Sequence, residues 1–503
     1  MKYFKIFGPP GCGKTHSLME ILDQELKKGT PPDRIALVTF TKKGAEEAKQ
    51  RAIEKFNFKE NELPYFRTLH SMAFNAMSVG YGSVMTMEHW KDLFSSLGLS
   101  SKSIDHVQSG VAGSDLDGDL CNMVFNMARN RAENIIDTYY DLNLPLAQEK
   151  LELFQKVVSD YKEEHHLNDF TDMLEDFKDT VPVDVAIIDE AQDLSFLQWR
   201  VVDTAFADAQ RMYMAGDDDQ AIYKWSGADA NIFRNREGEV RILNKSYRLP
   251  RVVWQLANNI SSQIKQRQAK KWFPKDDEGF IDHRTDISQI DMSKGEWLLL
   301  SRNKHLLKTY SKRCRALGYV YMLGNTPSVK TKHLNAITIW RSLMSGNAFA
   351  KLDLLPVLKL CEAFVDGSAF DVADDTDTFT VDELVDMGAL LNGGSWANLL
   401  TSISRTDREY YAEILSQGGK LDDAPRIKIS TMHATKGGEC DNVVVLSDMT
   451  KRCYTEYQDF PDETHRVFYV AVTRAKQSLF ILEPKTEYYY KFNWSFVLQS
   501  GNH

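Results

Sequence analysis

The sequence predicts an α/β protein with two core domains. Short apolar runs rich in β-branched residues alternate with longer segments of helical period, which is typical of buried parallel strands joined by helices. The chain has 503 residues, enough for two to four domains of about 100–200 residues each. The same alternation occurs in both halves of the chain, which predicts one sheet of this kind in each half.

The composition excludes several classes of protein. Lys and Arg total 61 and Asp and Glu total 71, so the formal net charge is −10 at pH 7. Hydrophobic residues at 43% and charged residues at 26% are ordinary globular values, which excludes a disordered chain, a collagen-like repeat and a globally basic nucleic-acid coat. Nucleic-acid binding stays open, because an acidic protein can still carry a local binding track.

The cysteine pattern and the hydropathy indicate a cytoplasmic protein. Six cysteines without a C-x-x-C pair form neither a disulfide framework nor a zinc module. The N-terminal apolar run is too short for a signal peptide, and no stretch reaches the ~18 apolar residues of a transmembrane helix. We therefore expect no membrane partner.

Ten apolar runs predict the strands in order. Those of the first half are KYFKIF (2–7), RIALVTF (34–40), DVAIIDE (184–190), RMYMAGD (211–217) and EVRIL (239–243). Those of the second half are EWLLLS (296–301), YVYML (319–323), IKIST (427–431), NVVVLSD (442–448) and SLFIL (478–482).

Two mostly helical stretches interrupt this alternation and predict insertions. The expected domains are 1–245, with an insertion at about 75–165, and 246–503, with an insertion at about 331–424. The second insertion carries an acidic run without calcium-loop spacing, which we interpret as solvated surface.

The segment after the first run has the spacing of a phosphate-binding loop. Gly8, Pro9, Pro10, Gly11, Cys12, Gly13, Lys14 and Thr15 match G-x-x-x-x-G-K-[ST], between a predicted strand and a predicted helix. The glycines allow backbone N–H groups to surround an anion, Lys14 can reach the β- and γ-phosphates, and Thr15 can bind Mg²⁺. The alternative is a structural glycine-rich turn, in which Cys12 is a small filler.

A second motif supplies carboxylates for hydrolysis. The run 184–190 ends in Asp189 and Glu190, where the carboxyl edge of a parallel sheet places ligands. Asp189 is a candidate Mg²⁺ ligand together with Thr15, and Glu190 is a candidate for activating the attacking water.

Further segments, in order along the chain, carry a family resemblance. They are VTFTKKGAEEAKQR (38–51), RTLHSMAF (67–74), DFTDML (169–174), DEAQD (189–193), MAGDDDQAIYKWSGA (214–228), LNKSYRLP (243–250), STMHATKGGECDNVVVL (430–446) and FYVAVTRAKQSL (468–479). Together with the phosphate loop, this set resembles the UvrD/Rep-like branch of the superfamily 1 DNA helicases. The resemblance implies two RecA-like P-loop NTPase domains, with ATP and Mg²⁺ bound between them.

The resemblance also implies roles at the nucleotide. Gln220 would contact the γ-phosphate or the attacking water, and Arg248 and Arg474 would act as arginine fingers from the second half of the chain. Tyr247 would stack on adenine, and Glu439 would contact the ribose.

A DNA track is implied by residues of the same segments. Phe40, Tyr223 and Trp225 would stack on bases, at ~1–3 kcal/mol per base. The candidates for polar contacts to the strand are Thr39, Thr41, Thr68, His70 and His433. The basic clusters 265–275 and 302–315 fit either this track or solvated helix faces.

The sequence departs from the family pattern in places. The first predicted strand begins at residue 2, so we expect no upstream adenine-binding glutamine segment, and we expect nucleobase selectivity to depend on Tyr247. Ser226 replaces the usual Arg after Trp225, and Gly437-Gly438-Glu439-Cys440 replaces G-L-E-F. No nuclease-like extension is expected after Ser478.

The expected function is ATP-dependent, 3′→5′ translocation on single-stranded DNA with duplex unwinding, in replication, repair or recombination. Expected partners are single-stranded DNA, duplex–single-strand junctions, and replication or repair proteins. The alternatives are a translocase that strips proteins without unwinding, a P-loop nucleotide kinase or ATP switch, and an inactive DNA-binding scaffold.

Overall fold

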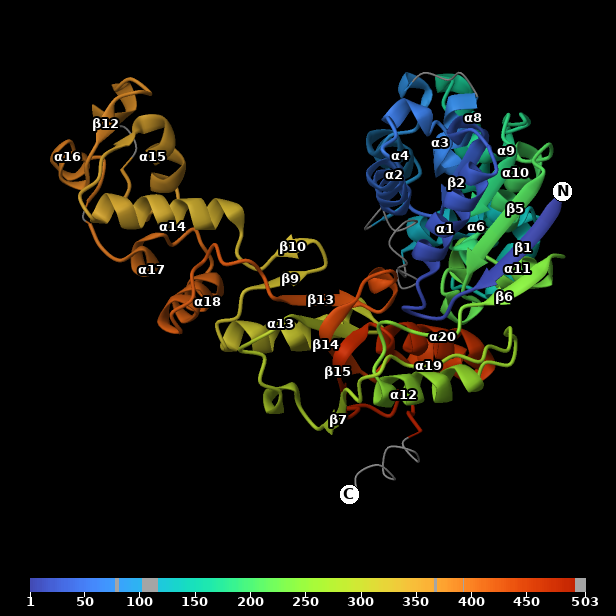
Figure 1. Ribbon diagram of the computed structural model, residues 1–503. Coiled ribbons are helices and arrows are strands. Elements are labelled where there is room, and N and C mark those ends of the chain that lie inside the picture. The colour runs from blue at the N-terminus through green and yellow to red at the C-terminus, as the bar shows by residue number, and fades with distance from the viewer. Residues whose placement is uncertain (77–80, 102–115, 366–368, 392, 494–503) are drawn as a thin grey trace, which may run out of the picture.

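The structure is a computed structural model that describes residues 1–76, 81–101, 116–365, 369–391 and 393–493. Two large β-sheets flanked by helices form the centre of the molecule (Figure 1). Almost all their strand pairs are parallel, which confirms the predicted α/β fold class. Each of the ten apolar runs overlaps a strand.

The first sheet has six parallel strands in the order β3-β2-β4-β5-β1-β6. They are β1 (Lys2–Phe7), β2 (Ile35–Thr39), β3 (Phe66–Thr68), β4 (Val185–Ile188), β5 (Arg211–Gly216) and β6 (Glu239–Ile242). The sequence analysis missed β3, because three residues give too short a pattern. Since all six strands are parallel, the loops that carry the predicted site residues leave the sheet at one edge.

Both faces of this sheet are covered, which explains why its strands are apolar without interruption. Val38 and Ile188 pack on one face, and their neighbours Leu37 and Ile187 pack on the other. The flanking helices are α1 (Lys14–Lys27), α2 (Lys42–Phe56), α3 (Leu69–Ala76), α9 (Phe170–Glu175), α10 (Phe196–Ala205) and α11 (Ala230–Asn235).

The segment 75–165, predicted as an insertion, is helical where it is described. It contains α4 (Met87–Ser96), α6 (Asp117–Arg131), α7 (Ile135–Leu142) and α8 (Gln148–His165), which share a separate apolar core. Residues 77–80 and 102–115 lie outside the described part of the chain.

The second sheet has seven strands in the order β10-β9-β13-β8-β14-β15-β7. They are β7 (Phe280–Arg284), β8 (Trp297–Ser301), β9 (Tyr321–Leu323), β10 (Thr326–Pro327), β13 (Ile427–Thr431), β14 (Cys440–Leu446) and β15 (Ala475–Leu482). Only the β9–β10 pair is antiparallel. The edge strands β7 and β10 were not predicted, because β7 is largely polar and β10 has two residues.

The helices α12 (Arg251–Ser262), α13 (Leu307–Ala316), α19 (Lys451–Asp459) and α20 (Pro461–Val472) flank the second sheet. Leu299 and Val444 face the core that contains α13 residues, and Leu298 and Val443 face the core that contains α12 and α20 residues. This sheet is therefore also buried on both faces.

The segment 331–424, predicted as the second insertion, projects to the left of the second sheet in Figure 1. It contains α14 (Thr331–Met344), β11 (Phe349–Ala350), α15 (Lys351–Leu358), β12 (Thr378–Phe379), α16 (Val381–Asp386), α17 (Trp396–Leu399) and α18 (Arg405–Ser416). Its core is continuous with that of the sheet, since Trp340 and Tyr411 belong to the same cluster as Leu299. The acidic residues Asp374 and Asp375 are exposed, as expected.

The two halves meet at the phosphate loop. Cys12 and Ile222 of the first half pack into the apolar core of the second, beside Leu249. The Ser246 hydroxyl donates a hydrogen bond to the Pro10 carbonyl at 2.7 Å. We propose a domain boundary near residue 245, between the two sheets.

All six cysteines are buried and none forms a disulfide. Among the helices of the described residues, none combines the length and apolar character needed to cross a bilayer.

Candidate functional site

The phosphate loop has the backbone that its glycines predict. It connects β1 to α1, and Gly11 and Gly13 adopt left-handed φ angles of 71° and 75°. A Cβ atom on Gly8 would lie 2.2 Å from Cγ of Lys14, so a side chain there would occupy the path of the lysine. The loop therefore leaves its backbone accessible at the N-terminus of α1, where an anion is favoured.

Lys14 and Thr15 open α1 at this loop. The Lys14 ammonium donates to the Gly8 carbonyl at 3.0 Å, and Thr15 is half-buried. The glycine backbone, the ammonium and the hydroxyl fit a triphosphate with its Mg²⁺.

Asp189 and Glu190 follow β4 beside this loop. The Asp189 carboxylate accepts from the Glu190 N–H at 2.9 Å. Burial, together with the negative charge of Glu190, raises the pKa of Asp189 to about 7. A buried carboxyl group with a raised pKa fits a metal ligand, because a divalent cation would stabilise its charged form.

The pKa of Glu190 is shifted in the opposite direction to that of Asp189. Burial alone would raise its pKa, but the charges of Lys14 and Lys436 and a hydrogen bond from Gln192 lower it. Its backbone is left-handed, at φ 51°, a conformation that costs a non-glycine residue energy. The site thus keeps a strained, ionised carboxylate beside the phosphate loop, as a general base requires.

Arg474 reaches from the second half to Gln220 of the first. Arg474 lies directly before β15, and its guanidinium donates to the Gln220 side-chain oxygen at 2.9 Å. It also donates to the carbonyls of Val470 and Gly438 and to the Thr473 hydroxyl. Burial, with a contribution from nearby Arg248, lowers the pKa of Arg474 to about 9, so an anion at this position would be stabilised.

Arg248 and Tyr247 lie directly against the phosphate loop. The Tyr247 N–H donates to the Gly11 carbonyl at 2.8 Å, and a Cβ on Gly11 would lie 2.3 Å from Cβ of Arg248. Arg248 pairs with Glu439, Nε to Oε2, at 2.7 Å. The Tyr247 side chain is 75% exposed, so one face of its ring is open to stacking. The structure thus brings Arg248, Glu439 and Tyr247 to one place.

The predicted threonines lie at the carboxyl ends of β2 and β3: Thr39 and Thr68 are the last residues of these strands, and Thr41 comes two residues after Thr39. Thr39 is buried and its hydroxyl donates to the Thr41 carbonyl at 2.8 Å. Exposed Thr41 accepts from the Gly44 N–H, and Thr68 accepts from the Ser71 N–H, so both hydroxyls keep a hydrogen to donate. Thr41 and Thr68 can therefore contact phosphate, whereas the Thr39 hydroxyl is already donating within the loop.

The predicted aromatic residues form a contiguous group. The Phe40 and Tyr223 rings stack with centroids 5.2 Å apart, and Trp225 meets Tyr223 edge-on at 6.0 Å. All three are half-buried, which leaves part of each ring accessible. Ser226 is uncharged and so supplies no cation here; its hydroxyl donates to the Tyr223 carbonyl.

The two predicted histidines are not charged at neutral pH. Burial lowers the pKa of His70 to about 4, and its ring meets that of Phe170 edge-on at 6.1 Å. Burial and the nearby charges of Arg302 and Lys436 lower the pKa of His433 well below its usual value. His70 and His433 can therefore offer only neutral hydrogen bonds.

Three side chains at the site were not predicted individually. The Lys436 ammonium bonds Asp193 at 2.5 Å and the Gln220 carbonyl at 2.6 Å, and lies 4.8 Å from the Tyr223 ring centroid. Phe170 is 55% exposed beside His70. All three residues, Lys436, Asp193 and Phe170, lie in the quoted motifs, but their pairing depends on long-range contacts that sequence spacing does not reveal.

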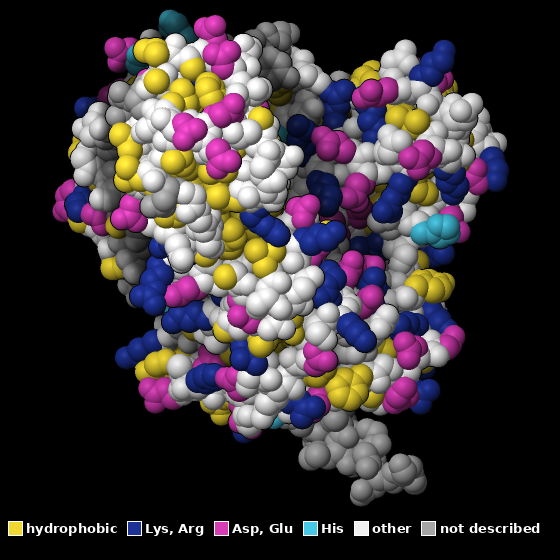
Figure 2. Space-filling view, turned by 90° about the vertical axis from the view of Figure 1, so that its left-hand side faces the viewer, with side chains coloured by type: hydrophobic (Ala, Val, Ile, Leu, Met, Phe, Trp, Pro, Cys, Tyr) yellow, Lys and Arg dark blue, Asp and Glu magenta, His cyan; other side chains and the backbone are white. Residues whose placement is uncertain are grey.

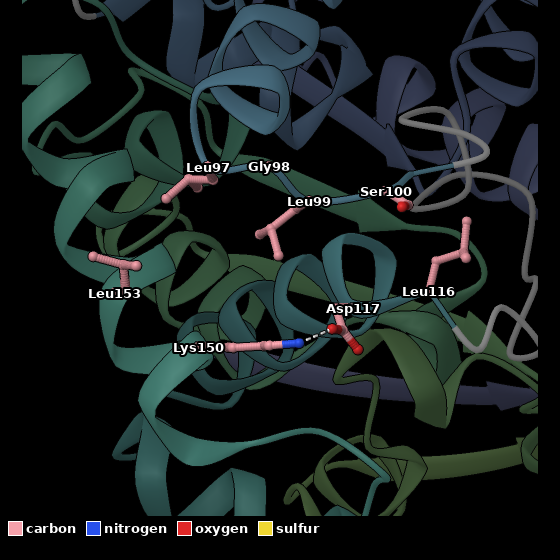
Figure 3. Close-up of a pocket in the computed structure, with 8 residues that line it drawn as sticks. All are labelled: Leu97, Gly98, Leu99, Ser100, Leu116, Asp117, Lys150 and Leu153. Atoms are coloured by element: carbon pink, nitrogen blue, oxygen red, sulfur yellow. Dashed lines mark hydrogen bonds and ion pairs between the residues drawn. The ribbon is translucent and has the colours of Figure 1, made fainter.

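The face shown in Figure 2 mixes Lys and Arg with Asp and Glu side chains around a hollow between two upper lobes. A separate cavity of about 470 Å³ lies among α4, α6 and α8 (Figure 3). Leu97, Leu99, Leu116 and Leu153 line it, and an ion pair between Lys150 and Asp117 lies beside them. It contains none of the residues predicted for nucleotide or DNA.

Comparison with known proteins places these motifs in a family. Residues 2–241 match the UvrD/REP helicase N-terminal domain, and residues 410–485 match the UvrD-like helicase C-terminal domain.

Individual relatives agree with this match. A protein of Mycoplasma pneumoniae named "Probable DNA helicase" is 23% identical over 296 residues, which cover 53% of this chain and 54% of the relative. The ATP-dependent DNA helicase PcrA of Staphylococcus aureus is 23% identical over 363 residues, 64% of this chain and 48% of PcrA. The chain spans about half the length of these curated relatives. The matched domains and the geometry of the motifs together show that the chain belongs to the UvrD/Rep helicase family.

Proposed function

We propose that this chain is an ATP-driven DNA helicase that moves 3′→5′ along single-stranded DNA and separates duplexes. The observation that carries the proposal is the convergence of two second-half guanidinium groups on the nucleotide elements of the first half. Arg248 lies against Gly11 of the phosphate loop, and Arg474 bonds Gln220. A site completed by both halves ties hydrolysis to their relative position, which a motor requires.

In this proposal the chain binds ATP with Mg²⁺ as cofactor. The bound ion would polarise the phosphate oxygens, and Thr15 and Asp189 would hold it. Lys14 positions the phosphates, and Glu190 accepts a proton from the attacking water. Gln220, Arg248 and Arg474 face the charge that develops on the transferred phosphoryl group.

The aromatic group would bind the single-stranded DNA along which ATP hydrolysis drives movement. Phe40, Tyr223 and Trp225 would stack on bases, which every base allows, so binding would not depend on sequence. Lys436 links this group to the site, because it contacts both Tyr223 and Gln220.

The direct test has two parts. ATP hydrolysis is measured with and without single-stranded DNA, and strand displacement is measured on 3′-tailed and 5′-tailed duplexes. We expect DNA-stimulated hydrolysis and displacement of the 3′-tailed duplex only. Stimulated hydrolysis without displacement would favour the alternative of a translocase that strips proteins, for which the missing cation at Ser226 is an argument. A rate of ATP hydrolysis that single-stranded DNA does not change would favour a P-loop kinase or ATP switch.

Trp225→Ala separates a motor from a kinase. Loss of one stacking platform of ~1–3 kcal/mol should weaken single-stranded DNA binding by about 5- to 150-fold and raise the DNA concentration needed for stimulation. Fluorescence anisotropy with a labelled oligonucleotide measures the affinity. Tyr140→Ala, at an exposed ring on α7, is the control. Unchanged DNA affinity in Trp225→Ala would remove this residue from the track.

A further inference from the structure

Three consecutive buried carboxylates immediately precede Gln220 in the chain. Asp217, Asp218 and Asp219 follow β5, and none is exposed to solvent. Their oxygens are close enough together to hold a metal ion, but Lys270 already lies among them. Its ammonium is 2.8 Å from Asp217 and 2.9 Å from Asp219, and it also bonds Asp218. The cation of this cluster is therefore a lysine of the second half.

The neighbours of Lys270 complete the cluster. Arg267 pairs with Asp219 through Nε at 2.8 Å and a terminal nitrogen at 2.5 Å. The Gln268 N–H donates to Asp218 at 2.5 Å. Burial alone would lower the pKa of Lys270, but the three carboxylates raise it, so the lysine stays charged. Arg267 and Lys270 thus lie neither on a DNA track nor on a solvated helix face, the two possibilities left open for the cluster 265–275.

Asp217 connects this cluster to the hydrolytic side chains by two short routes. Its carboxylate accepts from the Gln220 side-chain amide at 2.7 Å, and Gln220 in turn accepts from Arg474. Its backbone N–H donates to Gln192 at 2.9 Å, and Gln192 donates to Glu190 at 2.7 Å. Any shift of Asp217 would therefore be transmitted to the residues proposed to orient and activate water.

The segment that carries Lys270 is also fixed to α20, the helix that precedes Arg474. Asp462 accepts from the N–H groups of Lys265 and Gln266 at 3.0 and 2.9 Å. Arg466 donates to the Gln266 carbonyl at 2.7 Å and to the Asp218 carbonyl at 3.0 Å. The segment 265–270 of the second half therefore fixes the position of the Gln220 loop relative to α20, the helix that precedes Arg474.

We propose that Lys270 is a positioning residue for ATP hydrolysis: by fixing Asp217 it orients Gln220 and Glu190, and it does so only while the second half is seated on the first. This inference rests on the proposed function. Net stability alone does not account for such a cluster, because a buried ion pair gains little over apolar packing. Its hydrogen bonds lead instead to the side chains that turnover needs.

The test compares three variants of the full chain in the presence of single-stranded DNA. Lys270→Met removes the charge and keeps the volume, Lys270→Arg keeps the charge, and Lys294→Met alters an exposed lysine outside both basic clusters as a control. Misplaced catalytic groups cost about 10²-fold in rate, so we expect Lys270→Met to lower kcat by about that factor. We expect the KM for ATP to change less than about threefold, and Lys270→Arg to recover most of the activity.

Combination with Gln220→Ala tests the route of action. If Lys270 acts through Asp217 on Gln220, adding Lys270→Met to Gln220→Ala should lower kcat only a few-fold further. Equal effects of Lys270→Met in both backgrounds would overturn the route through Gln220, and wild-type kcat in Lys270→Met would overturn the whole inference.

Separate controls distinguish a failure of this inference from misfolding of the variant and from a failure of the proposed function. If Lys270→Met melts early, the double variant Lys270→Met/Asp218→Asn, which removes one charge of each sign, takes its place in the same comparison. A wild-type chain that hydrolyses no ATP with DNA overturns the proposed function and this inference together. An active wild type with an equally active Lys270→Met, or with an equally active double variant in its place, overturns the inference alone.

Discussion

Asp189 and Glu190 are neighbours in the chain, yet their surroundings shift their pKa values in opposite directions. Burial raises that of Asp189 to about 7, while Lys14, Lys436 and Gln192 outweigh burial and lower that of Glu190. Two carboxyl groups with separated pKa values can take different roles, which supports the proposed assignment of Asp189 as metal ligand and Glu190 as base. The sequence predicted both roles, but not Lys436, the cation that keeps Glu190 ionised.

Glu190→Gln should stop turnover and leave nucleotide binding intact. The amide keeps the volume of the side chain but cannot accept the proton, and general base catalysis contributes about 10²–10⁴-fold. Single-turnover hydrolysis and fluorescent nucleotide titration measure the two effects. Glu237→Gln, at an exposed position before β6, is the matched control. Turnover close to that of the control would assign the base elsewhere.

Among the elements, the phosphate loop was the most predictable and the connections between halves the least. A loop of eight contiguous residues shows its strand, its glycines and its helix in the local pattern. The second insertion was predicted from its helical pattern, but the short strands β11 and β12 were not. Their two residues each pair only because the fold brings Phe349 and Phe379 together.

Gly11→Ala tests whether the loop and the second half must touch. A Cβ there would lie 2.3 Å from Cβ of Arg248, and the residue also needs φ +71°. Gly29, after α1, has φ +91° but open space around it, so Gly29→Ala is a control for backbone strain alone. We expect Gly11→Ala to lower DNA-stimulated ATPase at least about tenfold more than Gly29→Ala. Equal activities would show that the contact is dispensable.

The attachment of α18 to the second core should depend on pH. Asp407 on α18 bonds Arg315 of α13 at 2.6 Å and Lys330, before α14, at 2.9 Å. Burial alone would raise its pKa, but these two cations lower it to about 2. Because the folded-state pKa is depressed, the stabilisation is present above pH ~4 and is lost as the pH falls toward 2.

Asp407→Asn measures this contribution. A depression from 3.8 to about 2 corresponds to about 2 kcal/mol of stability at pH 7, which the variant should lack. Urea unfolding followed by tryptophan fluorescence at pH 7 and pH 3.5 gives the difference, with exposed Asp422→Asn as control. If the difference in unfolding free energy between the wild type and Asp407→Asn is the same at both pH values, the effect comes from packing and not from the charge of Asp407.

Across the whole molecule, the family, the α/β fold and the two sheets could be predicted from ordered motifs and apolar runs. The pairing of the halves could not, because Arg474 with Gln220 and Lys270 with Asp217 join residues far apart in sequence. Such contacts depend on how two separately formed cores dock. In the proposed function, their convergence on one site makes the boundary between the halves the place where hydrolysis would be coupled to movement.

Arg474→Ala tests that coupling most directly, with Arg474→Lys to retain the charge and exposed Arg241→Ala as control. Measured at saturating single-stranded DNA, kcat for ATP should fall by about 10³-fold or more in Arg474→Ala, as expected for an arginine finger. Nucleotide affinity should stay close to wild type, and the chain should remain folded. Near-normal turnover, or a lowered melting temperature as the only change, would contradict a nucleotide site completed by the second half of the chain.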